Sequence, residues 1–294
     1  MAAYLISICI IGLIYALLAI GLNIEYGETG LINFGHVAYF AIGAYASALL
    51  SMHGLAVPPA IVLAGLLAAF AAIPIGFAAL RLKDDYFAIV TLGFAEAVRI
   101  VVQQEEWLTH GVQGIAAIPR LTALPGAAQN EVFLVVILAV VLCAMASVYL
   151  VQHSAFGRIL RAIRDNEVAV VALGKKTAGF KIKVLMFGSF FAGLAGAFYA
   201  HFISFISPEQ FIALVTFYAW MSIILGGVGT MKGSLAGSLV LVLLLEGSRF
   251  IGDFLPGVSD VQVAHLRLGV IGFILVIFSL YRPHGLFGKG DQAC

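Results

Sequence analysis

The stretch HSAFGRILRAIRDNEVAVVALGKKTAGFKIK, residues 153–183, is strongly basic in a chain that is otherwise almost continuously apolar. It holds 7 of the 16 Lys and Arg residues among 294. Lys and Arg in the short loops of a membrane protein favour the cytoplasm. We therefore expect residues 153–183 to form a cytoplasmic segment between two membrane spans.

The composition agrees with a membrane protein. Hydrophobic residues make up 62% of the chain and charged residues 11%, whereas a soluble domain carries roughly 25% charged residues. The net charge of +1 argues against a nucleic-acid partner, although the basic segment leaves room for contact with anionic membrane lipid.

Runs of about 20 apolar residues are long enough to cross a hydrocarbon core about 30 Å thick. Their number predicts an all-α, polytopic bundle of about nine spans (eight to ten), in one transmembrane domain covering residues 1–294. The expected spans are 3–24, 33–52, 57–80, 86–102, 131–152, 184–204, 211–228, 234–252 and 264–281.

The positions of the basic residues predict the orientation of these spans. With residues 153–183 inside, twelve of the sixteen Lys and Arg lie inside, which places the amino terminus outside and the carboxyl terminus in the cytoplasm. The five basic residues that join the segment on that side are Arg81, Lys83, Lys232, Arg282 and Lys289. A broken or re-entrant helix at residues 25–35, which contain three glycines, would raise the count to ten and move the amino terminus inside.

A second glycine-rich region lies about 200 residues after the first. Gly226, Gly227 and Gly229 are too closely spaced for a regular helix and predict a turn or unwound element. Gly233 and Gly237 have the spacing of closely packed helices, and we favour packing for them. Paired interruptions of this kind are expected where unwound backbone lines a transport pathway near the middle of the membrane.

Polar residues inside the expected spans allow two interpretations. Glu96 and Arg99 stand three apart on one helix face, and a local ion pair is favoured over a substrate contact. Glu246 and Arg249 repeat this spacing. Asn33 and His36 follow the first glycine-rich region. Asn33 either caps the next helix or faces the pathway, and His36 is either a buried histidine or a second pathway residue.

The sequence contains none of the motifs that enzymes of the common classes need. It has no phosphate-binding loop, no His or Cys spacing typical of metal sites, and no evident nucleophile and base. We expect a chain that is not an enzyme and that binds no cofactor or metal of its own.

The basic segment itself predicts two short helices. Residues 156–169 can form an amphipathic helix, followed by a second one that ends near Gly174, a favourable residue just beyond a helix end. Arg158, Arg161 and Arg164 recur every three positions along one face. Such a helix could contact a partner protein, or it could lie on anionic lipid at the membrane surface.

Several motifs, in this order, resemble those of a known family. They are residues 21–23, 30–36 and 43–45, the run 85–94 (DYFAIVTLGF), the run 161–167 (RAIRDNE), and residues 193–197 (GLAGA), 225–229 (LGGVG) and 282–288 (RPHGLFG). The chain resembles, over almost its whole length, the inner-membrane permeases of branched-chain amino-acid ABC importers, M-type.

The resemblance implies a multi-pass protein of a bacterial inner membrane. It implies an H-type permease as heterodimer partner, two cytoplasmic ATPase subunits that bind ATP and Mg, and a periplasmic solute-binding protein. Branched-chain or related hydrophobic amino acids would be the cargo, with a urea or short-amide permease as the alternative. An ion-coupled secondary transporter is disfavoured because Glu96 and Glu246 each have an Arg nearby.

The resemblance also implies roles for individual residues. Residues 161–174 match the segment that couples importer permeases to their ATPases, although Val170 replaces an Ala found in many members. The candidate coupling residues are Arg158, Arg161, Ala162, Ile163, Arg164, Asp165, Asn166, Glu167 and Gly174. The candidate pathway residues are Asn23, Asn33, His36, Tyr86, Glu96, Gly226 and Gly227.

Overall fold

The computed structural model describes residues 2–79, 82, 84–121 and 127–247, and beyond these residues 269, 272–273, 276–278, 280–282 and 285–288. The expected span 264–281 lies mostly outside the described residues. Four basic residues also lie outside the described residues, namely Arg81, Lys83, Arg249 and Lys289.

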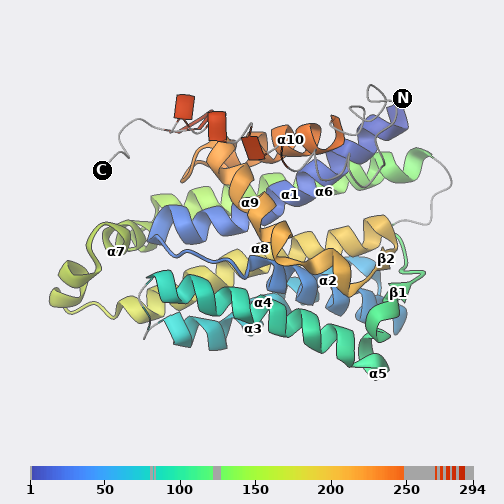
Figure 1. The fold of residues 1–294 in the computed structure, drawn as a ribbon, viewed down its shortest axis with the longest axis horizontal. Helices are drawn as coiled ribbons and strands as arrows, with labels where there is room; N and C mark the ends of the chain where they lie inside the picture. Colours follow the sequence, from blue (N-terminus) through green and yellow to red (C-terminus); the bar gives the residue numbers. More distant parts are fainter. Residues whose placement is uncertain are drawn as a thin grey trace.

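The described chain is almost entirely helical (Figure 1). Its long elements are α1 (Ala2–Thr29), α2 (His36–Met52), α3 (Val57–Ala79), α4 (Asp84–Gln104), α6 (Ala127–His153), α7 (Ala155–Ala172), α8 (Thr177–Ile203), α9 (Ala213–Gly226) and α10 (Met231–Gly247). Its short elements are α5 (Glu106–Thr109), η1 (Gly111–Gln113), β1 (Ile115–Ala116), β2 (Phe205–Ile206) and η2 (Pro208–Phe211). This confirms the all-α fold.

Helix α8 lies at the centre and packs against α1, α2 and α3. The backbones approach closely because glycines face each other. A Cβ atom on Gly43 of α2 would collide with the carbonyl oxygen of Gly193 of α8. Small residues at such crossings are typical of membrane helices, which associate through close packing rather than through the hydrophobic effect.

Helices α1, α3, α4, α6 and α8 run roughly along the long axis of the molecule, which has two distinct ends (Figure 1). Helix α7 lies at one end. The amino terminus, α5 and the two strands lie at the other, where β1 pairs antiparallel with β2 through Ile115 and Ile206. The amino terminus is therefore on the side opposite to α7, as the charge distribution predicts.

Eight of the nine expected spans coincide with described helices. Five of these helices, α1, α3, α4, α6 and α8, are long and apolar enough to cross a membrane. Helices α9 and α10 meet at an angle of 118° and count as one further span if taken together, while α2, with 17 residues, is shorter. The count of nine is thus not confirmed within the described residues.

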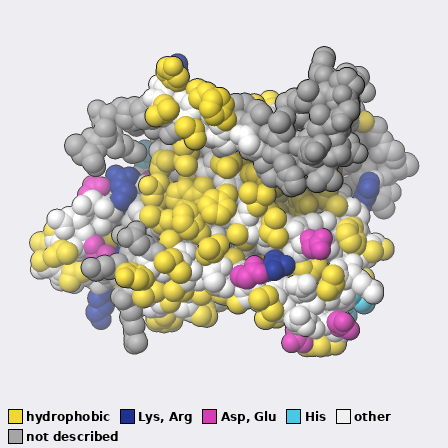
Figure 2. All heavy atoms as spheres, viewed as in Figure 1, with side chains coloured by type: hydrophobic (Ala, Val, Ile, Leu, Met, Phe, Trp, Pro, Cys, Tyr) yellow, Lys and Arg dark blue, Asp and Glu magenta, His cyan; other side chains and the backbone are white. Residues whose placement is uncertain are grey.

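The surface agrees with a membrane environment. Figure 2 shows hydrophobic side chains covering most of the described surface in the middle of this face, with few charged side chains among them. Large apolar residues such as Phe70 of α3 and Leu150 of α6 are more than half exposed. Apolar surface of this extent is expected where lipid or other subunits surround a protein.

Candidate functional site

The last two turns of α1 carry four buried polar side chains, and three of them, Asn23, Glu25 and Glu28, bind other parts of the chain. Burying such groups is costly unless each finds hydrogen-bond partners. Each of the three meets a different part of the chain, and we call the region that they connect the α1 junction.

Asn23 binds the connection between α9 and α10, residues 227–230, which we call the elbow. Its Nδ2 donates to the carbonyl oxygen of Thr230 at 3.0 Å and to Oγ of Ser234 at 2.7 Å. Its Oδ1 accepts a hydrogen bond from the backbone N–H of Gly229 at 2.8 Å. One side chain of α1 thus binds the elbow at Gly229 and Thr230 and the first turn of α10 at Ser234.

Glycine makes the elbow possible. Gly227 and Gly229 have φ values of 112° and 76°, a region that other residues rarely adopt. A Cβ atom on Gly237 of α10 would collide with the carbonyl oxygen of Ser222 of α9. Both sequence-based interpretations, an unwound element at residues 226–229 and close packing at Gly233 and Gly237, are confirmed.

A short piece of the carboxyl-terminal region also binds beside the elbow. The backbone N–H groups of Leu286 and Phe287 donate to the carbonyl oxygens of Leu225 and Gly226, each at 2.9 Å. These carbonyls belong to the last turn of α9, where helical partners are lacking. The end of α9 at the elbow is therefore completed by residues 61 positions further along the chain.

Glu25 binds the other interruption, an unwound link of residues 30–35 between α1 and α2. Its Oε2 accepts a hydrogen bond from Nδ2 of Asn33 at 2.8 Å, and its Oε1 lies 3.5 Å from Nδ1 of His36. Both partners are fully buried. Asn33 also accepts from the N–H of Gly35, so it satisfies the backbone just ahead of α2 without being the residue that caps it.

Side chains of other helices satisfy the rest of the link. The hydroxyl of Thr91 in α4 accepts from the N–H of Phe34 at 3.1 Å, and that of Thr216 in α9 accepts from the N–H of Val37 at 2.9 Å. Nε1 of Trp220 donates to the carbonyl oxygen of Asn33. Unwound backbone away from water requires such partners, which come here from α4 and α9.

Glu28 joins α1 to α7. Its Oε2 accepts from Nη1 of Arg161 at 3.0 Å, and its Oε1 accepts from Nε2 of Gln152 in α6 at 2.9 Å. Nη1 of Arg164 donates to the carbonyl oxygen of Gly27 at 2.6 Å. Two cationic side chains thus sit at the carboxyl end of α1, the negative end of its dipole.

Helix α7 consists of two short helices in series, as predicted, but the break lies at Asn166, inside the expected first helix of residues 156–169. Ser154 caps the first by accepting from the N–H of Gly157. Asn166 has non-helical angles (φ −160°, ψ 93°) and caps the second by accepting from the N–H of Ala169. Gly174 has φ of 78°, and the N–H groups of Gly174 and Lys175 donate to residues 171 and 170, which is a Schellman ending.

Two further contacts fix α7 to α8. Nζ of Lys181 donates to Oε2 of Glu167 at 2.7 Å, and the rings of Phe156 and Phe180 stack with centroids 5.5 Å apart. Since α7 is also bound to α1 and α6, it is held by three helices. Helix α7 is therefore firmly attached to the bundle and should move together with it.

The coupling candidates separate into two groups. Ile163 is buried, and Arg161, Arg164 and Glu167 contact the bundle, so they do not present a free basic face to a partner. The exposed candidates are Arg158, Ala162, Asp165, Asn166 and Gly174.

Apolar residues missed by the sequence analysis form the tip of α7. Val168 is 79% exposed and Leu173 80% exposed. A hollow of about 360 Å³ lies between the two short helices, lined by Arg158, Ala162 and Leu173 among others. An exposed apolar tip beside a hollow is typical of a surface that another protein covers.

Two pathway candidates lie away from the α1 junction. Tyr86 is 61% exposed on α4, and the Glu96 side chain is 50% exposed and paired with Arg99. The predicted ion pair is confirmed, while neither residue joins the buried polar groups. Glu246 accepts a hydrogen bond from the hydroxyl of Tyr4, and its expected partner Arg249 lies outside the described residues.

Comparison with known proteins agrees with this architecture. Residues 4–279 match the family model described as branched-chain amino acid transport system / permease component. The chain is 31% identical to the Escherichia coli high-affinity branched-chain amino acid transport system permease protein LivM, over 98% of this chain and 74% of that protein.

More distant relatives include both types of permease. A probable LivM of Methanocaldococcus jannaschii is 26% identical, over 93% of this chain and 90% of the relative. The LivH permease of Salmonella typhimurium is also 26% identical, over 96% and 93% of the two chains. No solved structure gives a significant match. The chain belongs to the branched-chain amino acid transport system permease family, as an M-type member.

Proposed function

We propose that this chain, with an H-type permease, forms the membrane pathway of an ATP-binding-cassette importer for branched-chain or related hydrophobic amino acids. Two cytoplasmic ATPases would supply the energy, and a periplasmic binding protein would deliver the amino acid. The likeness to LivM and LivH permeases supports the cargo class and the pairing of two permeases.

One observation supports the energetic role most directly. The tip of α7 is exposed and apolar at Val168 and Leu173, whereas Arg161 and Arg164 are bonded to α1. An ATPase that covers the tip would therefore act on a helix whose other side is attached to the α1 junction.

The junction offers a physical route from the tip to both interruptions. A displacement of α7 reaches Gly27 and Glu28 of α1 through Arg164 and Arg161. Asn23 and Glu25 lie one to two turns away on the same helix and hold the elbow and the link. The ATPase can drive transport only if it binds the tip differently in its ATP-bound and ATP-free states.

This role requires α7 and the carboxyl terminus to face the cytoplasm. Cysteines introduced singly at Leu173 and Trp107, both exposed and at opposite ends of the molecule, allow a direct test once Cys9, Cys143 and Cys294 are replaced by serine. A membrane-impermeant thiol reagent added outside intact cells should label the Trp107→Cys variant and leave Leu173→Cys unlabelled until the cells are opened. Labelling in the reverse order would contradict the proposal.

Transport itself is tested with the complete complex in proteoliposomes. Radiolabelled leucine should enter only with ATP and the binding protein, vanadate should block its entry, and unlabelled isoleucine or valine should compete. Competition by urea in their place would identify a short-amide permease. Uptake stopped only by a protonophore would identify an ion-coupled carrier.

A further inference from the structure

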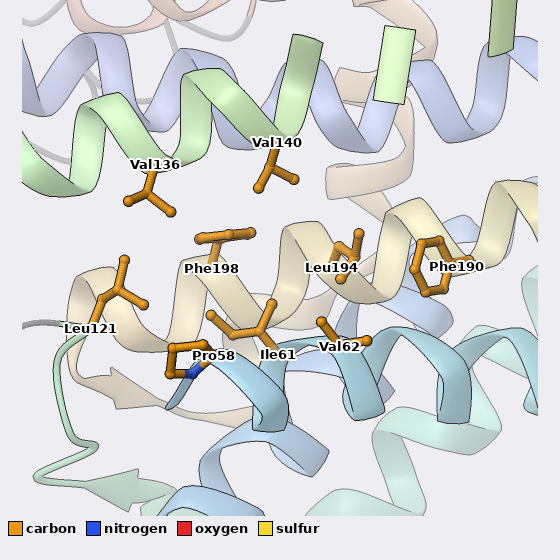
Figure 3. A pocket seen from close by; sticks show the side chains of 9 residues that line it. All are labelled: Pro58, Ile61, Val62, Leu121, Val136, Val140, Phe190, Leu194 and Phe198. Atoms are coloured by element: carbon orange, nitrogen blue, oxygen red, sulfur yellow. The ribbon is translucent and has the colours of Figure 1, made fainter. Parts of the chain in front are cut away.

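A groove opens on the outside of the bundle between α3 and α6, with α8 as its floor (Figure 3). Its volume is about 400 Å³, within the size range of small-molecule sites. Its lining is apolar, with Pro58 and Ile61 from α3, Val136 and Val140 from α6, and Leu194 and Phe198 from α8.

The groove begins near the end of the bundle opposite to α7. Pro58 is the second residue of α3, and Phe198 lies five residues before the end of α8. The deepest α8 residue that lines it, Phe190, lies 13 residues before that end, which corresponds to about 20 Å along a helix. The groove therefore covers roughly the depth of one leaflet of a bilayer.

Arg120 stands at the mouth of this groove, next to the lining residue Leu121. Its Nε donates to Oγ of Ser204 at 3.3 Å, and its Nη1 donates to Oε1 of Gln129 at 3.2 Å. Ser204 ends α8 and Gln129 lies in the first turn of α6. The guanidinium is thus held between the ends of two helices that form the groove.

The backbone beside Arg120 is held in place as well. The N–H of Ile118 donates to the carbonyl oxygen of Ser204 at 3.2 Å, and Nδ1 of His201 donates to the carbonyl oxygen of Pro119 at 2.6 Å. Among the described residues, two of the five N–H groups of the guanidinium find hydrogen-bond partners, and the side chain is exposed. Arg120 can therefore present its other N–H groups to an anion from a fixed position.

We propose that the groove is a binding site for an anionic phospholipid. One acyl chain lies in the groove, and the phosphate of the headgroup accepts hydrogen bonds from Arg120. The exposed guanidinium beside an apolar groove favours a phospholipid, because one such molecule carries both a phosphate for the cation and an acyl chain for the groove. Arginine suits phosphate because its planar fork of donors can bind two oxygens at once.

The test measures which lipid the intact complex retains. The complex, purified in mild detergent, is exchanged into an equimolar mixture of dioleoyl phosphatidylglycerol and dioleoyl phosphatidylcholine, and the retained lipid is quantified by mass spectrometry. We expect a preference for phosphatidylglycerol of about fivefold, the effect of one basic residue at a membrane surface.

In the Arg120→Ala variant, the ratio of retained phosphatidylglycerol to phosphatidylcholine should fall to about one. The Arg120→Lys variant should retain part of the preference. Val140→Trp, which fills the groove, should reduce retention of both lipids, whereas Leu142→Trp, on the same helix but outside the groove, should not. Equal retention by the wild type, or a preference unchanged in Arg120→Ala, would overturn the proposal.

A protein occupant would give a different result. If a partner helix fills the groove, Val140→Cys should crosslink efficiently to a cysteine in the H-type permease, and this too would overturn the lipid site. The lipid measurement does not depend on transport activity. A negative result would therefore overturn the lipid site and leave the proposed function of the chain unaffected.

Discussion

Nη1 of Arg164 donates a hydrogen bond of 2.6 Å to the carbonyl oxygen of Gly27, which joins the basic segment to the last turn of the first helix. With the ion pair between Arg161 and Glu28, this bond turns the arginine face of α7 toward the bundle. Arg161 and Arg164 thus attach α7 to α1, while its exposed residues include Arg158 and the apolar tip at Val168 and Leu173.

Charge reversal of the two arginines should separate ATP hydrolysis from transport. Arg161→Glu with Arg164→Glu places carboxylates beside Glu28 and the negative end of the α1 dipole, so α7 should lose its attachment. We expect ATP-driven leucine uptake to fall more than tenfold while the permeases still assemble and the ATPases still hydrolyse ATP. Wild-type uptake by this double variant would contradict the attachment.

A contrasting variant probes the tip of α7. Leu173→Asp places a charge on an exposed apolar residue that is not bonded to α1. We expect the ATPases to co-purify more weakly with this variant, whereas the arginine variant keeps them. A loss of ATPases in both variants, or in neither, would show that the two surfaces do not have separate roles.

Removal of Asn23 should loosen the elbow. Asn23→Ala eliminates three hydrogen bonds and leaves the part-buried N–H of Gly229 without its partner, while the hydroxyl of Ser234 keeps its bond to the carbonyl oxygen of Thr230, at a cost of about 1–3 kcal/mol. Thermal unfolding of the purified complex should shift to lower temperature, with reduced uptake. Ser7→Ala, at an exposed position on the same helix, is the control.

Adding a methyl group where α9 and α10 pack together should reduce uptake as much as removing the hydrogen bonds of Asn23. Gly237→Ala would force α9 and α10 apart, because its methyl group meets the carbonyl oxygen of Ser222. We expect lower complex yield and little uptake. Gly93→Ala, in α4 with nothing near the new methyl group, should be neutral or stabilising by up to about 1 kcal/mol. Equal behaviour of the two variants would contradict the close packing.

His36 should contribute to transport through its contact with Glu25. His36→Ala leaves a buried space and removes the ring beside the carboxylate, so we expect slower transport by a complex that assembles normally. His36→Gln, which keeps a donor of similar reach, should recover part of the activity. Unchanged transport by His36→Ala would remove this residue from the functional region.

Local features of the basic segment were predictable from the sequence. Arg158, Arg161 and Arg164 share a helix face at a spacing visible in the chain, and Gly174 ends the second helix because it adopts positive φ easily. The elbow at Gly227 and Gly229 was predictable for the same reason. Each of these signals depends on residues only a few positions apart.

The buried carboxylates Glu25 and Glu28 were not predictable in the same way. The first span was expected to end at residue 24, which placed both in a loop, whereas α1 continues to Thr29. For Glu28 the partners explain the difference, because Gln152 and Arg161 lie more than 120 residues away and supply the compensation that local sequence cannot show. Glu25 binds the nearer Asn33 and His36, and the expected helix end at residue 24 concealed this contact. The inward orientation of Arg161 and Arg164 depends on the same distant contacts.

The spacing of Asn23, Glu25 and Glu28 along α1 has a consequence for the evolution of the family. Inserting or deleting one residue between Asn23 and Glu28 would rotate one part of the helix by about 100° relative to the other. No single substitution could restore the three sets of contacts, since they belong to separate segments. Length variation among homologues should therefore be absent from this stretch and should accumulate in the connections at the far end of the molecule.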